Sequence, residues 1–239
     1  MYDRDSSPAN GKLRVSDYCL EIFLMKMDAI YSMIFGVLVM LPCAKKTCGG
    51  SVNRTWKLSD IRIRDPFILA EETTQTYYMY AQMDNRRGRK GHQKGVEVYT
   101  SKDLQQWAGP YPVFVIGEDF WADRMVWAPE VHEYGGRYYL FVTFTAEEPL
   151  EPIPGRPPLV KRGTQILVSD SPEGPFKPFE NRPHTPLDWM ALDGTLWVED
   201  GTAWMVFCHE WVQIRDGTME LVRLKEDLST VQGRPVTLF

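Results

Sequence analysis

The sequence predicts an all-β protein of the β-propeller type. From residue 60 onward the chain consists of short runs rich in β-branched and aromatic residues, which are separated by Gly, Asp, Asn and Pro. These runs show almost no helical periodicity. One layout of strands and turns also recurs three times, at a spacing typical of a propeller blade.

Six runs are expected to form strands, because each is rich in apolar and aromatic residues and is bounded by turn-forming residues. They cover residues 76–82, 95–101, 137–144, 164–169, 195–199 and 202–210. Two of the connections, YGGR at 134–137 and EDG at 199–201, are typical of hairpin turns.

Each repeat begins with an acidic residue that opens an apolar strand, followed by a turn and an aromatic-rich strand. The acidic residues are Asp65, Glu130 and Asp193, which are spaced by 130 − 65 = 65 and 193 − 130 = 63 residues. A third strand and a bend follow in each unit. A module of roughly 64 residues with about four strands is typical of one propeller blade.

The repeat also predicts where these acidic side chains lie. The first strand of each blade lines the central channel of a propeller. Acidic residues at the start of successive first strands are therefore expected to converge at one end of that channel. A coincidence of acidic turn residues is the alternative, because Asp is common at turns.

Carboxylates near aromatic side chains indicate carbohydrate chemistry. Four tryptophans lie close in sequence to the acidic positions, namely Trp127, Trp189, Trp197 and Trp211. An inverting glycosidase needs an ionised carboxylate to activate water and a protonated carboxylic acid to serve the leaving oxygen. Asp65 follows Arg64, and a nearby guanidinium would keep it ionised, as a general base requires.

The ordered motifs RDPF, WAPEV with its GRYYLF hairpin, SDSPEGPF and LDGTLWVEDG resemble family 43 of the glycoside hydrolases. The resemblance extends from about residue 58 to the C-terminus. It implies a five-bladed β-propeller that acts mainly on arabinose- and xylose-containing plant polysaccharides. By position, it implies that Asp65 is the general base and that Asp193 tunes the pKa of the acid and orients the substrate.

The general acid of the resembling family is a glutamate that opens the fourth blade, beyond the last residue of this chain, Phe239. Within this chain the candidate acid is Glu210 in FCHEW, with a substrate-binding or structural role as the alternative. His209 and Glu210 point to opposite sides of their strand, so only one of them can face the channel.

Three residues are candidates for substrate binding: Trp127, Glu130 and His209. Trp127 would be a sugar platform, or else a tryptophan buried between blades. Glu130 is expected to contact the substrate or Arg124 rather than to transfer a proton.

The chain is expected to have two parts. Residues 1–57 would be a leader and linker, and residues 58–239 the first three blades of a glycosidase propeller. Because the resembling family has five blades, we expect a fragment whose activity alone is doubtful. The apolar run at 29–42 is shorter than the roughly 20 residues of a membrane-spanning helix and matches a signal-peptide h-region.

This apolar run predicts export to the periplasm, the cell surface or the medium. Cys43 directly follows the run and makes a lipid anchor an alternative. A buried helix of a cytosolic protein is the other alternative. Membrane contact is therefore expected only through a signal peptide or a lipid anchor.

Composition excludes several other functions. The formal net charge is −5 with no long Lys/Arg run, so nucleic acid is not expected as a partner; the basic stretch at 85–95 is interpreted as a solvated hairpin loop. The four cysteines form no CxxC pair, and HExxH is absent. We expect no required cofactor. The resemblance implies at most a structural calcium ion, with no assignable ligands.

The sequence leaves two other functions open. A non-catalytic carbohydrate-binding propeller would keep the aromatic platforms without needing Asp65 and Asp193. A five-bladed hydrolase of the fructan- and sucrose-cleaving type also carries an RDP motif, but in a later blade after an N-terminal WMNDPNG, and this chain has neither arrangement.

Overall fold

The computed structural model describes residues 55–83 and 93–239. The apolar run at 29–42 and most of the basic stretch at 85–95 lie outside these ranges. None of the helices in the described ranges is long and apolar enough to cross a membrane.

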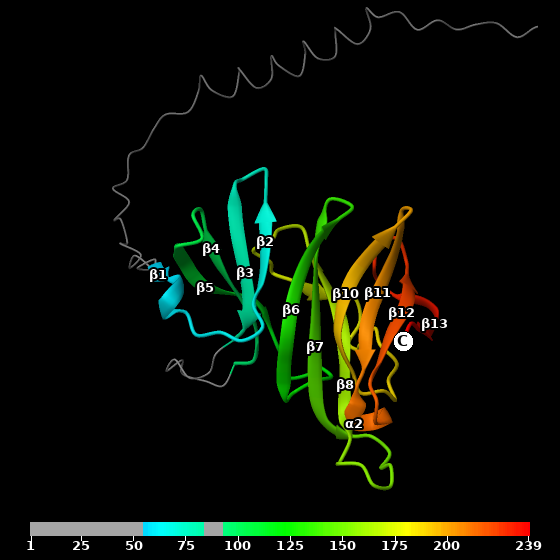
Figure 1. Cartoon of the computed structure of the whole chain (residues 1–239). Coiled ribbons are helices and arrows are strands. Elements are labelled where there is room, and N and C mark those ends of the chain that lie inside the picture. The colour runs from blue at the N-terminus through cyan, green and yellow to red at the C-terminus, as the bar shows by residue number, and fades with distance from the viewer. Residues whose placement is uncertain (1–54, 84–92) are drawn as a thin grey trace, which may run out of the picture. The chain divides into compact units, whose positions relative to one another are not determined.

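Three antiparallel sheets follow one another along the chain and lie side by side (Figure 1). The first has the order β1-β5-β4-β3-β2, from β1 (Thr55–Lys57), β2 (Phe67–Glu71), β3 (Thr76–Gln82), β4 (Gly95–Ser101) and β5 (Gln106–Val115). The second has the order β6-β7-β8-β9, from β6 (Met125–Tyr134), β7 (Arg137–Pro149), β8 (Val160–Ser169) and β9 (Lys177–Pro178). The third has the order β10-β11-β12-β13, from β10 (Ala191–Glu199), β11 (Thr202–His209), β12 (Thr218–Leu224) and β13 (Val231–Thr237).

This architecture confirms the all-β prediction, with three blade-like sheets in the described part of the chain. Helical structure there is limited to the 3-10 turn η1 (Leu58–Asp60) and the short helix α2 (Trp211–Ile214). β3 and β4 coincide with the predicted runs at 76–82 and 95–101. The second and third sheets are meanders, because their consecutive strands pair in order, whereas in the first sheet β1 lies beside β5.

Both predicted hairpin turns are present, and their backbone angles explain their sequences. Gly135 and Gly136 have φ of 57° and 75°, and Asp200 and Gly201 have φ of 48° and 71°. Two successive residues with positive φ are the geometry of a type I′ turn, which favours glycine and aspartate.

The first sheet includes residues that the sequence analysis assigned to the linker. β1 pairs with β5 from Thr55 to Lys57, opposite Ala108 to Gln106. The indole Nε1 of Trp56 donates a hydrogen bond to the carbonyl oxygen of Gly109 at 2.8 Å. The fold therefore already contains residue 55.

Two hydrophobic interfaces hold the three sheets together. Tyr80 and Val98 of the first sheet pack in one core cluster with Leu140 of the second, and Phe141 of the second packs in another with Met205 of the third. Leu140 and Phe141 are adjacent, so their side chains point to opposite faces of the sheet. The middle sheet is therefore apolar on both faces, and each fully buried side chain of this size contributes roughly 1.5–3 kcal/mol.

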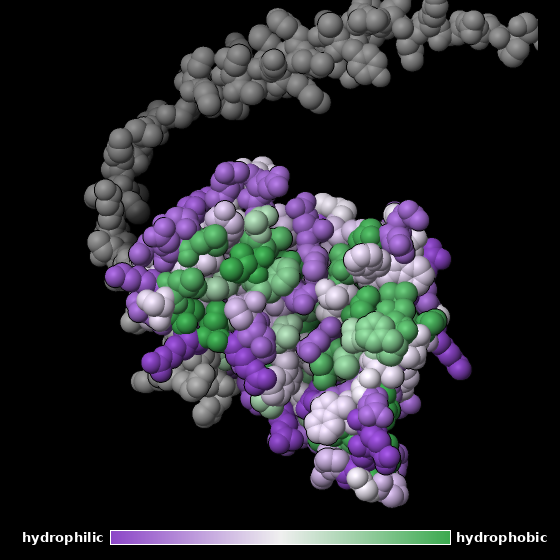
Figure 2. Space-filling model, in the orientation of Figure 1, coloured by the Kyte–Doolittle hydropathy of each residue, from purple (hydrophilic) through white to green (hydrophobic). Residues whose placement is uncertain are grey.

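The far face of the third sheet remains open within the described structure. Trp197 and Val236 are 54% and 63% exposed. Figure 2 shows hydrophobic surface over β10 and β11. Among the sheets described here, the third therefore packs on its neighbour through one face.

Candidate active site

Four acidic side chains from three sheets meet at one cavity of about 580 Å³. The lining residues are Arg64, Asp65, Trp127, Ala128, Glu130, Thr143, Arg162, Leu192, Asp193 and Glu210. Asp65 lies just before β2, and Asp193 lies in β10. The structure thus brings together the two aspartates that the sequence analysis expected to converge. This space is called the carboxylate cavity below.

The three repeats share one backbone feature, a non-glycine residue with positive φ. This feature shows that Glu130 does not hold the same position in its repeat as Asp65 and Asp193 hold in theirs, which corrects the prediction from sequence. Asp65, Ala128 and Asp193 have φ of 47°, 36° and 54°, a region that non-glycine residues rarely occupy. They are spaced by 128 − 65 = 63 and 193 − 128 = 65 residues. Ala128 is therefore the second-sheet counterpart of the two aspartates.

Glu130 lies two residues further along its strand than this shared position. The strand register agrees with this alignment of the repeats. In β6 the register shifts between Trp127 and Glu130, and in β10 it shifts between Leu192 and Thr195. Glu130 follows the bulge, and its counterpart in the third sheet is Thr195. It still reaches the carboxylate cavity, but from a different position in the repeat.

Threonines of the second sheet hold the bulge that carries Asp193. The backbone N–H of Asp193 donates to Thr143 Oγ1 at 2.9 Å, and that of Gly194 donates to Thr164 Oγ1 at 3.0 Å. The two hydroxyl oxygens are 3.2 Å apart. A Cβ on residue 194 would lie 2.6 Å from Cγ2 of Thr164, so the close approach of the strands requires glycine there.

The pKa of Asp193 reflects the charges around the carboxylate cavity. Its partial burial raises the pKa of its carboxyl group, and the negative charges of Asp65, Glu130 and Glu210 raise it further. Arg162 acts in the opposite direction and lowers the pKa. Three carboxylates from elsewhere in the chain are thus close enough to disfavour the charge on Asp193.

Asp65 and Trp127 are connected through arginine. Nε of Arg64 donates to Oδ2 of Asp65 at 3.1 Å, so the neighbouring guanidinium does contact this carboxylate. The guanidinium carbons of Arg64 and Arg162 lie 5.1 and 5.9 Å from the centroid of the Trp127 ring. A sugar that stacks on Trp127 therefore has to share the ring with these cations.

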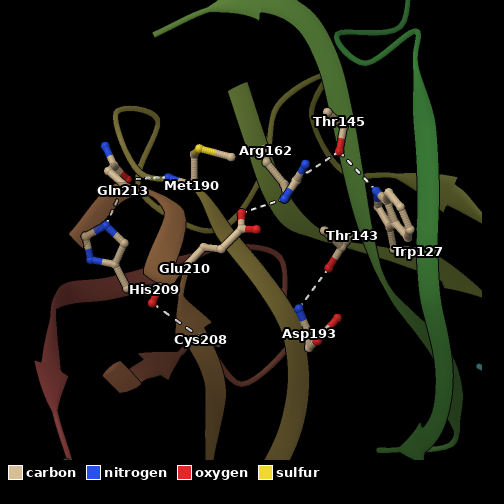
Figure 3. A network of polar contacts seen from close by, with 10 residues as sticks. All are labelled: Trp127, Thr143, Thr145, Arg162, Met190, Asp193, Cys208, His209, Glu210 and Gln213. Carbon is tan, nitrogen blue, oxygen red and sulfur yellow. Dashed lines mark hydrogen bonds and ion pairs between the residues drawn. The ribbon is translucent and has the colours of Figure 1, made fainter. Parts of the chain in front are cut away.

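Arg162 is a site residue that the sequence analysis did not identify. Its Nη1 donates to Oε2 of Glu210 at 2.5 Å, and its Nε donates to Oγ1 of Thr145 at 3.0 Å. Trp127 Nε1 donates to the same Thr145 oxygen at 3.1 Å, which completes the chain of contacts in Figure 3. No motif marked Arg162 in the sequence, because it stands beside Lys161 at the start of an ordinary strand.

Glu210 occupies the residue between the end of β11 and α2 and is 8% exposed. Its Oε2 forms an ion pair with Nη1 of Arg162, and both side chains are largely buried. This contact fits the alternative that the sequence left open, a substrate-binding or structural role for Glu210.

His209 points away from the cavity-facing Glu210 (Figure 3), as alternation along β11 requires. Its ring stacks on Trp189, with the centroids 4.0 Å apart. Its Nε2 lies 2.8 Å from Oε1 of Gln213, which also accepts the backbone N–H of Met190, so Nε2 is the protonated donor. His209 thus supports the chain around Glu210, whereas the sequence analysis placed it among the substrate-binding residues.

The partner of Glu130 is His132 rather than Arg124. Nε2 of His132 lies 3.1 Å from Oε2 of Glu130. The His132 ring also contacts Phe67 and Phe141, at 5.4 and 5.5 Å between centroids. Glu130 is thereby anchored at the interface between the first two sheets.

Metal binding finds no support among the residues that the structure describes. No group of three or more His, Cys, Asp or Glu side chains there is arranged to hold an ion. No step of the proposed chemistry depends on a metal ion.

Three blade-like sheets around a carboxylate-lined cavity define a propeller-type class of protein. The model of glycosyl hydrolases family 43 matches residues 58–239. The chain belongs to this family.

Individual relatives agree with this assignment. The chain is 24% identical over 204 residues to the extracellular exo-α-(1→5)-L-arabinofuranosidase ArbA of Cellvibrio japonicus, covering 79% of this chain and 49% of the relative. It is 30% identical over 92 residues to xylosidase/arabinosidase 43A of Humicola insolens, covering 38% and 24%. The solved endo-arabinase of Bacteroides thetaiotaomicron superposes with a TM-score of 0.62 at 43% identity, covering 77% of this chain and 58% of that one.

The chain thus spans half or less of the two sequence relatives and 58% of the solved arabinase.

Proposed function

We propose that this chain forms part of a glycoside hydrolase that cleaves O-glycosidic bonds in arabinose- or xylose-containing plant polysaccharides or oligosaccharides. The observation that supports this most is the meeting of Asp65, Glu130, Asp193 and Glu210 at one cavity. Membership of family 43 and relatives named for arabinan and xyloside cleavage agree with it.

The proposed mechanism is inversion by two carboxyl groups. Asp65, held by Arg64, accepts a proton from the attacking water while the water oxygen bonds to the anomeric carbon. A protonated carboxylic acid gives its proton to the leaving oxygen as the glycosidic bond breaks.

Asp193 is proposed to orient the sugar and to influence the proton affinity of the acid through its charge. Glu210, the candidate acid from sequence, is paired with Arg162. We therefore assign Glu210 to substrate positioning. Glu130 is assigned to substrate binding, and Trp127 to a sugar platform shared with the two arginines.

Turnover by the full chain tests this proposal. The chain is incubated with an aryl α-L-arabinofuranoside and an aryl β-D-xyloside, with Asp65→Asn in parallel and EDTA in a third set. The proposal predicts release of the aryl group, which can leave as a phenolate without a proton from a general acid. It also predicts loss of this release in Asp65→Asn with sugar binding retained, and no effect of EDTA, because no cofactor is proposed. Sugar binding that is unchanged by Asp65→Asn, without turnover, would instead support a non-catalytic binding propeller.

We also propose that the protein is exported. The support is the apolar run at 29–42, and ArbA of Cellvibrio japonicus is named as extracellular. Mass spectrometry of the protein after expression in a bacterial host tests this. Cleavage after the run supports a signal peptide, a lipid on Cys43 supports an anchor, and an intact cytosolic chain contradicts both.

A further inference from the structure

A second cavity, of about 310 Å³, adjoins the carboxylate cavity and has the opposite charge. The lining residues are Arg62, Ile63, Arg64, Gln82, Met83, Lys94, Gly95, Arg124, Met125 and Val126. Four of these residues are cationic, and the described lining includes no carboxylate. In a chain of net charge −5, this basic pocket is a local reversal of charge.

Two of the four cations are available for a ligand. Arg62 and Arg124 are exposed, and among residues 55–83 and 93–239 neither side chain forms an ion pair or hydrogen bond. Asp123 precedes Arg124, but its Oδ1 accepts the backbone N–H of Glu147 at 3.0 Å. The ammonium group of Lys94 contacts the backbone oxygen of Asp123, which leaves its charge unneutralised.

The basic pocket and the carboxylate cavity are continuous through Arg64, which lines both. Val126 faces the basic pocket, and the next residue, Trp127, faces the carboxylate cavity. A ligand longer than one sugar residue can therefore occupy both spaces at once.

The guanidinium groups and apolar side chains of the basic pocket suit a sugar that carries a carboxylate group. Guanidinium groups bind carboxylates through two parallel hydrogen bonds. The pocket is also lined by Ile63, Met125 and Val126, apolar side chains that suit the C–H face of a sugar ring and that an inorganic anion does not need. Its volume is sufficient for one sugar residue.

We propose that the basic pocket is a subsite for a hexuronate residue of the polysaccharide bound at the carboxylate cavity. This inference rests on the proposed function and narrows its substrate class to arabinose- or xylose-containing chains that carry uronate groups. Arg62 and Arg124 are its specificity-determining residues.

Binding of three ligands by the full chain tests the proposal: xylotriose, xylotriose that carries a glucuronate group, and the methyl ester of that glucuronate. The ester keeps the shape and removes the charge. Calorimetry at low and high salt is expected to show about tenfold tighter binding of the free acid than of the ester, with the difference reduced by salt. Arg62→Gln/Arg124→Gln should abolish this difference, whereas Arg223→Gln, an exposed arginine on β12, should keep it.

Equal binding of the acid and the ester, or no binding of either, would overturn the subsite. Displacement of the acid by inorganic phosphate at equal concentration would also overturn it, because the site would then recognise an anion rather than a sugar. The aryl glycoside assay is read separately with neutral substrates. Turnover of the aryl glycosides without tighter binding of the free glucuronate would overturn the subsite and leave the proposed function intact. Tighter binding of the free glucuronate without turnover would support the subsite and count against the proposed function.

Discussion

Arg162 of the second sheet and Glu210, which follows β11 of the third sheet, form an ion pair of 2.5 Å whose side chains are only 18% and 10% exposed. Burial of two charges is costly unless both are paired and further hydrogen-bonded. Arg162 satisfies this condition through Thr145. The pair therefore fixes the position of Glu210 across two sheets.

Removal of one residue of the Arg162–Glu210 ion pair should destabilise the fold. Arg162→Gln leaves the Glu210 carboxylate buried without its charge partner, and we expect the free energy of unfolding to fall by about 3–5 kcal/mol. Urea denaturation measures this. Arg162→Gln/Glu210→Gln should recover part of the loss. A single variant as stable as the wild type would show that the pair contributes little.

Arg162 also stabilises the charge on Asp193. Its removal should therefore raise the pKa of Asp193, since Arg162 is the cation that lowers it. Carbon-13 NMR of the labelled aspartate carboxyl groups follows this titration. An unchanged Asp193 titration in a folded Arg162→Gln variant would place Arg162 too far away to act on it.

Gly194 should not tolerate a methyl group. Gly194→Ala forces its Cβ against Thr164, so we expect a loss of about 1–3 kcal/mol and weaker binding of substrate through the displaced Asp193. Gly117→Ala is the matched control, because a Cβ there meets nothing within 4 Å. Thermal unfolding compares the two variants, and equal melting temperatures would contradict the close packing.

His184 should make stability depend on pH. Burial lowers its pKa to about 4, with Nδ1 accepting the backbone N–H of Ile166 at 3.2 Å and Nε2 donating to the oxygen of Ser229. An unfolded histidine titrates near 6.5, so the unfolded state binds more protons between these values. Stability should therefore decrease as pH falls from about 6.5 to about 4, by roughly 3 kcal/mol in total.

The slope of the free energy of unfolding against pH tests this, because loss of packing alone does not change it. His184→Gln should lower stability at neutral pH yet flatten the slope in this window. A slope that survives the substitution would assign the effect to other groups.

The strands and the convergence of Asp65 and Asp193 could be predicted because both depend on local pattern and period. β3 and β4 follow apolar and aromatic runs with clear ends, and the hairpin glycines and aspartate mark backbone with positive φ. The spacing of the repeats then places one end of each first strand at the channel.

The position of Glu130 and the role of Arg162 could not be predicted in the same way. In the sequence, the repeats were aligned on their acidic residues. In the structure, they align on the residues with positive φ, which are Asp65, Ala128 and Asp193. The alanine in the second repeat is not acidic, so the sequence did not reveal this position. Arg162 reaches Glu210 across 48 residues and two sheets, a contact that exists only after the sheets pack.

Asp65 and Asp193 share one cavity although they are 193 − 65 = 128 residues apart. The most direct test is the titration of Asp193 by carbon-13 NMR in the wild type and in Asp65→Asn, with Asp200→Asn in the β10–β11 turn as the control. Because the charge of Asp65 raises the pKa of Asp193, its removal should lower that pKa, and the control should not. An Asp193 pKa that is the same in all three proteins would separate the two carboxylates and contradict the account.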